Sequence, residues 1–139
     1  GWLIALAVTV TSLSAGVSTP LEAKSSAVQS IQSTASFYCA GAWTYVSCTP
    51  VLTTSREGTI TIQVTNHANF GEVCQLTRPE QNGTFTPITG VHWIDYGDNS
   101  PKTFSPASGG FPAGTKFVLR CKRRAGSGDA GIGGYVYYP

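Results

Sequence analysis

The sequence predicts an α+β protein in which a long N-terminal hydrophobic helix precedes an antiparallel, immunoglobulin-like β-sandwich. No ionisable side chain precedes Glu22, and the apolar residues of that stretch recur at three- and four-residue steps, which is a helical period. From Phe37 onward, apolar and polar residues alternate in short segments that turn residues separate. We therefore expect two domains, a helical stem over residues 1–36 and a sandwich head over residues 37–139.

The stem is expected to form a helix because its uncharged run is long enough. About twenty residues at 1.5 Å each give a helix about 30 Å long, close to the hydrocarbon thickness of a bilayer. Pro20 removes one intrahelical hydrogen bond, so we expect an irregularity between Gly16 and Pro20. The side chains expected to form a polymerisation core are Trp2, Leu3, Leu6, Val10, Leu13 and Val17.

The head is expected to contain six or seven short strands. The clearest is 59–65, where Ile60, Ile62 and Val64 face inward and the threonines face outward. Turn residues recur about every ten positions, a spacing typical of a β-sandwich. The other predicted strands are 37–39, 43–48, 72–78, 91–96, 116–122 and 135–138.

The four cysteines predict two disulfides. No pair has the Cys-x-x-Cys spacing of zinc or redox sites. Three pairings are possible, and the preferred one joins Cys39 to Cys48 and Cys74 to Cys121, so that one bond closes a local hairpin and the other ties a middle strand to a late one. The longer loop should stabilise the folded state by about 4 kcal/mol in the chain-entropy model.

The uncharged apolar start, the proline at position 20 and the β-rich remainder resemble the type IV pilins. Ala5 occupies the position where bacterial type IV pilins usually carry Glu, so the archaeal branch, which includes the archaeal flagellins, fits best. The resemblance implies a structural subunit of an extracellular, cell-surface filament. Its precursor would be inserted in the membrane, it would polymerise with itself through the hydrophobic helix, and its head would be exposed for adhesion.

Two alternatives stay open. Residues 18–23 resemble the small-residue site that signal peptidase cleaves, although no basic segment precedes the apolar run. The protein would then be a small secreted, disulfide-stabilised binding or inhibitor protein, with residues 1–23 a cleavable signal. Residues 8–11 alternate Val and Thr, which would suit a filament whose subunits donate a strand to a neighbour's sandwich.

No motif in the sequence predicts an enzyme, a cofactor or a metal site. The two histidines, His67 and His92, lie far apart in the sequence and are expected to be a turn residue and a strand residue. Asp95, Asp98 and Asn99 match no calcium loop and are interpreted as turn residues. The net charge of +2 is too small to favour a nucleic acid partner.

Two surface features are candidates for contacts. Asn82 begins the sequence Asn-Gly-Thr, an acceptor site for N-glycosylation. Five of the nine basic residues gather near one late strand, which is interpreted first as a solvated edge strand guarded by charge. The functional alternative is an electrostatic contact with an acidic neighbour, a glycan, or a host or surface polymer, made by Lys116, Arg120, Lys122, Arg123 and Arg124.

Overall fold

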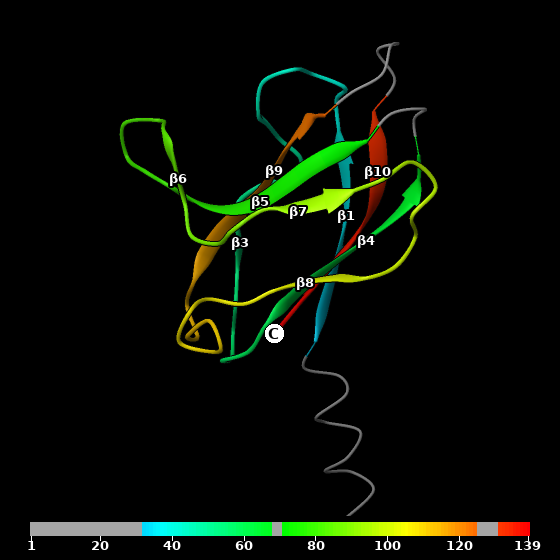
Figure 1. Cartoon of the computed structure of the whole chain (residues 1–139). Helices are drawn as coiled ribbons and strands as arrows, with labels where there is room; N and C mark the ends of the chain where they lie inside the picture. Colours follow the sequence, from blue (N-terminus) through cyan, green and yellow to red (C-terminus); the bar gives the residue numbers. More distant parts are fainter. Residues whose placement is uncertain (1–31, 68–70, 125–130) are drawn as a thin grey trace, which may run out of the picture. The chain divides into compact units, whose positions relative to one another are not determined.

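A computed structural model describes residues 32–67, 71–124 and 131–139 of the chain. Ser33–Pro139 form one compact unit. The strands of the described residues are β1 (Ser33–Cys39), β2 (Val46–Ser47), β3 (Leu52–Thr53), β4 (Ile60–Asn66), β5 (Glu72–Pro79), β6 (Phe85–Pro87), β7 (His92–Ile94), β8 (Lys102–Phe104), β9 (Lys116–Arg123) and β10 (Ile132–Tyr138) (Figure 1).

The strands form two antiparallel sheets that pack as a sandwich. One sheet has the order β1-β10-β4-β8, and the other has the order β2-β9-β5-β6, with β3 beside β9 and β7 beside β5. Side chains of both sheets share a single core, to which β4 contributes Ile60, Ile62 and Val64, and β9 contributes Phe117 and Leu119. Alternation along these strands produces the core, because every second residue of a strand points to the same face.

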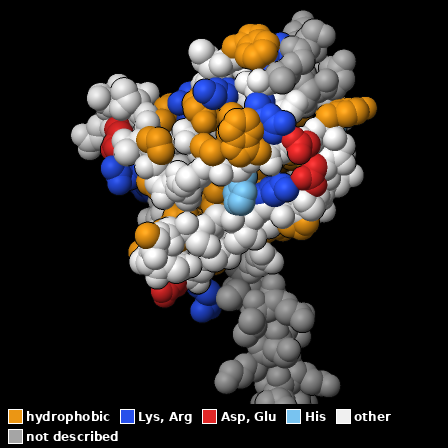
Figure 2. All heavy atoms as spheres, viewed as in Figure 1, with side chains coloured by type: hydrophobic (Ala, Val, Ile, Leu, Met, Phe, Trp, Pro, Cys, Tyr) orange, Lys and Arg blue, Asp and Glu red, His pale blue; other side chains and the backbone are white. Residues whose placement is uncertain are grey.

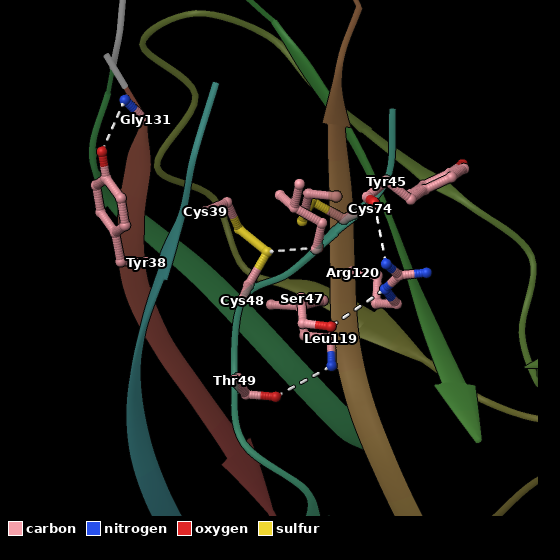
Figure 3. The surroundings of a disulfide bond; sticks show 12 residues. Tyr38, Cys39, Tyr45, Ser47, Cys48, Thr49, Cys74, Leu119, Arg120 and Gly131 are labelled. Atoms are coloured by element: carbon pink, nitrogen blue, oxygen red, sulfur yellow. Dashed lines mark hydrogen bonds between the residues drawn. A yellow bond between two sulfur atoms is a disulfide. The ribbon is translucent and has the colours of Figure 1, made fainter. Parts of the chain in front are cut away.

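Both cysteine pairs are disulfides in the core. Cys39 is bonded to Cys48 and Cys74 to Cys121, the preferred pairing of the three. The Cys74–Cys121 bond joins residues that are directly opposite each other on β5 and β9. The Cys39–Cys48 bond joins β1 of one sheet to the residue that follows β2 of the other, and Figure 3 shows its surroundings.

The expected α+β class is wrong for this chain, because the described residues form an all-β fold that contains no helix. Ser33–Ser36, which the prediction placed at the end of the helical stem, lie in β1 and pair with β10. Nowhere in 32–67, 71–124 or 131–139 is there a helix with the length and hydropathy needed to cross a membrane. The expected polymerisation core, Trp2, Leu3, Leu6, Val10, Leu13 and Val17, lies outside the described residues.

The immunoglobulin-like strand order is also wrong. In immunoglobulin domains the last strand lies beside the preceding one, in the sheet that does not hold the first two strands. Here the last strand, β10, lies between β1 and β4 in the four-stranded sheet, while β9 lies in the other sheet (Figure 1). The position beside β9, where an immunoglobulin domain would have its last strand, is occupied by the short strands β2 and β3.

Glycines in and beside β10 allow neighbouring strands to approach closely. A Cβ atom at Gly134 would overlap the backbone of Gln63 on β4, and the register between β10 and β4 shifts between Gly133 and Gly134. A Cβ at Gly131 would overlap Tyr38, whose hydroxyl accepts a hydrogen bond of 3.2 Å from the Gly131 amide (Figure 3). Glycine is therefore required at positions 131 and 134, because the neighbouring atoms leave no space for a side chain.

This crowding generates a stability prediction. We expect Gly134→Ala to lower the free energy of unfolding by about 1–3 kcal/mol, the usual cost of overpacking, because the obstacle is backbone and cannot rotate away. Gly90→Ala is the matched control, since a methyl group added there would have open space around it. Urea unfolding measures both variants, and equal midpoints for the two would contradict the prediction.

Candidate functional site

The predicted basic residues lie mainly on β9, which is not the solvated edge strand that was expected. β9 is central, because β2 and β3 pair with one side of it and β5 pairs with the other. The buried residues Phe117, Leu119 and Cys121 face the core, as the alternation predicted. Lys116, Arg120 and Lys122 therefore project from the opposite, outer face of the six-stranded sheet.

Four aromatic rings accompany the cations at the end of β9 and beside it. The Arg120 guanidinium lies 4.2 Å from the centre of the Phe85 ring, and the Lys122 ammonium lies 4.9 Å from that of Tyr45. Arg123 lies over Trp43 at 4.9 Å, and Arg124 lies over Trp93 at 4.8 Å. The cation–aromatic face, as we call this surface, consists of Tyr45, Phe85, Trp93, Arg120, Lys122 and Arg124. Trp43 is not part of it, because its cation, Arg123, lies on the inner side of β9.

Hydrogen bonds restrain the side chain of Arg120. Its guanidinium donates to the Tyr45 carbonyl oxygen at 3.0 Å and to the Ser47 hydroxyl at 3.3 Å (Figure 3). These contacts and the Phe85 ring restrict the side chain before any ligand arrives. The face therefore presents a positioned cation, which loses less entropy on binding than a free one would.

The positive charge of this face is only partly neutralised. Arg124 forms an ion pair with Asp95 at 2.7 Å. Neither Arg120 nor Lys122 forms an ion pair with another described residue. Figure 2 shows Lys and Arg side chains beside hydrophobic ones on one side of the molecule, with acidic side chains toward its margin.

Two tryptophans, Trp93 of the face and Trp43 beside Arg123, are unusually accessible for such large apolar side chains. Trp43 is 59% exposed and Trp93 is 58% exposed. Exposed apolar area of this kind beside polar groups is typical of interaction surfaces. The sequence prediction found the cations but missed their aromatic partners, because stacking between residues as distant as Trp93 and Arg124 depends on strand pairing.

Arg123, the remaining predicted contact residue, belongs to the interior. It is 7% exposed, and it lies opposite Glu72, which is 1% exposed, in the pairing of β5 with β9. Neither carboxylate oxygen of Glu72 has a hydrogen-bond partner among the described residues. Burial raises the pKa of Glu72 to about 7, while the charge of Arg123 acts in the opposite direction.

The other polar candidates have local structural roles. His67 lies 2.6 Å from the Asn99 side-chain oxygen, and His92 lies 2.7 Å from the Thr103 carbonyl oxygen. Asp98 accepts hydrogen bonds from Lys102 and Ser100, which lower the pKa of its carboxyl group. These contacts fit the interpretation of the region as turns.

No metal site is supported by the residues that could offer ligands. The one group of three suitable side chains in the described part of the chain is Cys39, Cys48 and Cys121, whose sulfur atoms lie within 4.8 Å of one another. All three sulfurs are in disulfides and cannot act as thiolate ligands.

Asn82 lies in an exposed turn between β5 and β6. Its side-chain oxygen accepts hydrogen bonds from the Thr84 amide at 3.1 Å and the Thr84 hydroxyl at 2.6 Å. The following residue, Gly83, has a φ of 85°, in the region that favours glycine. The structure therefore explains Asn-Gly-Thr as a turn, and glycosylation of Asn82 stays a prediction.

A cavity of about 480 Å³ opens at the end of the sandwich near the loop between β8 and β9. Its lining is mainly apolar, with prolines and the buried Phe111 beside Arg78 and Lys116. Arg78 is paired with Glu80 at 3.0 Å. The cavity therefore offers fewer unpaired charges than the cation–aromatic face.

Comparison with known proteins gives no identification: no family model matches the chain, and no curated protein matches it.

Glu72 makes stability depend on pH. Its pKa is about 7 in the folded protein, compared with 4.5 normally, so the unfolded state loses this proton at lower pH than the folded state. The contribution is therefore most favourable below pH 4.5 and is lost as the pH rises to about 7, by about 3 kcal/mol in all. We expect Glu72→Gln, which cannot ionise, to abolish this fall.

Urea unfolding at a series of pH values tests this expectation. The quantity compared is the difference in the free energy of unfolding between the wild-type protein and Glu72→Gln. Glu57→Gln is the control, because it removes a carboxylate from an exposed position. A difference between wild type and Glu72→Gln that stays constant from about pH 4 to about pH 8 would show that Glu72 does not titrate in this window.

Proposed function

We propose that the protein is an extracellular binding module whose cation–aromatic face attaches to a polyanionic surface polymer. The observation that carries the proposal is the positioning of Arg120 and Lys122, each over an aromatic ring and neither in an ion pair with another described residue. Such cations attract an anionic ligand without first breaking an internal salt bridge. The two disulfides support the extracellular assignment, since such bonds persist in oxidising compartments.

The size of the face suits a polymer better than a small ligand. Its residues extend from Tyr45, just before β2, across β9 to Phe85 of β6 and Trp93 of β7, and so span the six-stranded sheet. Individually, exposed ion pairs contribute about 0–1 kcal/mol, so several are needed together for useful affinity. A polymer supplies a repeated charge and engages several cations at once.

The test is binding of the full chain to an immobilised polyanion, such as polygalacturonate. We expect binding at low salt and its loss at about 1 M salt, where the Debye length falls to about 3 Å. Lys122→Ser should weaken binding about fivefold, which corresponds to about 1 kcal/mol. Arg56→Ser, which removes an equal charge from an exposed residue outside the face, should leave binding unchanged.

We also propose, as a second function, that this module is the head of a filament subunit. The observation that favours it is the N-terminal sequence, where no charged side chain occurs before Glu22. Apolar segments of several subunits could then associate without charge repulsion. Adhesion through the cation–aromatic face would be compatible with such a filament.

A charge placed in that apolar segment tests the second proposal. We expect Leu6→Asp to abolish filaments, because an isolated carboxylate in an apolar assembly costs several kcal/mol per subunit. Filament yield from expressing cells, viewed by electron microscopy, is the measurement, and Arg56→Ser is again the control. Normal filaments from Leu6→Asp cells would rule out assembly through this segment.

A further inference from the structure

We infer that the polymer is an acidic polysaccharide, bound by stacking of its sugar rings on the aromatic side chains as well as by its charges. This inference rests on the proposed function, because it names the ligand of the same face. The observation behind it is the presence of aromatic residues in the face, because a purely electrostatic contact would not need them.

One row of side chains shows how the face is organised. Trp93 on β7 lies opposite Val73 on β5, and Val73 lies opposite Lys122 on β9. Lys122 lies over the ring of Tyr45, next to β2. Neighbouring strands are about 4.8 Å apart, so this row, with an aromatic ring at each end and a cation between, spans about 14 Å.

The composition of the row fits a chain of charged sugar units. The face of a pyranose ring presents C–H bonds of slight positive charge, which suit the electron-rich face of an aromatic ring. The carboxylate or sulfate group of the same sugar suits a Lys or Arg side chain. The row, with one cation and a ring at each end, therefore offers both kinds of contact that a charged sugar unit can make.

The stacked cations restrict the aromatic side chains and still leave part of the ring surface accessible to a ligand. A cation covers one face of a ring, and Trp93, with Arg124 at 4.8 Å, still exposes 58% of its surface. Cation–aromatic contacts also restrict the side chains that form them. A ligand with only linear charged groups would pair with the cations but leave the exposed ring of Trp93 in water.

Single-stranded nucleic acid combines phosphates with stacking bases and is the competing class of ligand. Two observations favour the polysaccharide. The net charge of the chain is only +2, whereas nucleic-acid-binding domains are usually strongly basic. The two disulfides place the protein in an oxidising compartment under the proposed function.

The experiment compares the binding of the full chain to four polymers: polygalacturonate, polyglutamate at equal carboxylate concentration, uncharged dextran and oligothymidylate. We expect polygalacturonate to bind most tightly and dextran not to bind. Trp93→Ala should weaken binding of polygalacturonate about tenfold and change binding of polyglutamate less than about twofold, because only the sugar uses the ring. Trp93→Phe should restore most of the loss.

Tyr135→Ala is the matched control, since Tyr135 is an aromatic residue, 42% exposed, on β10 of the other sheet, and its loss should affect neither polymer. The protein could bind polyglutamate and polygalacturonate equally well, and Trp93→Ala could leave both affinities unchanged. That result would overturn the polysaccharide inference and leave the proposed function intact. Tighter binding of oligothymidylate than of polygalacturonate would overturn it in favour of nucleic acid. Failure to bind any polyanion would overturn the proposed function itself.

Discussion

The pairing of β5 with β9 is the constraint on which the rest of the structure depends. Their register places Cys74 opposite Cys121, and the disulfide between these residues permits no slip of the two strands. A shift by one residue would turn every side chain of β9 to the other face of the sheet. The same bond therefore keeps Leu119 in the core and keeps Arg120 and Lys122 outside. The second disulfide has a different effect, because it connects the two sheets through Cys39 of β1 and Cys48, which follows β2.

The sequence predicted the positions of strands well wherever apolar and polar residues alternate over a long segment. Residues 59–65, 72–78 and 116–122 are predicted as strands, and the structure places β4, β5 and β9 there within one residue at each end. The strands β3, β6 and β8 were missed, because two or three residues alone cannot establish a period of two; β2 and β7 are as short but lie within the longer predicted segments 43–48 and 91–96. The predicted last strand, 135–138, leaves out the first three residues of β10, because glycine has low strand propensity but is required at Gly134 by crowding.

Other features could not be predicted because they depend on contacts distant in sequence. Ser33–Ser36 carry a pattern of small residues that suits either a helix end or a strand, and pairing with β10 decides for the strand. The strand order differs from that of immunoglobulin domains for the same reason. In the candidate site, the cations were evident from composition, but the ring beneath each one was not.

Under the proposed function, the two faces of β9 separate folding from binding. Phe117, Leu119 and Cys121 are completely buried, so changes at these positions remove core contacts. Arg120 and Lys122 lie on the other face, where their contacts are to Tyr45, Ser47 and Phe85 instead of the core. Arg120 and Lys122 can therefore change in charge and size with little effect on the core, whereas Val118, on the same side of β9, is 2% exposed and cannot. If the proposed function holds, the charge and the ligand of the face could therefore be altered at Arg120 and Lys122 without altering the sandwich.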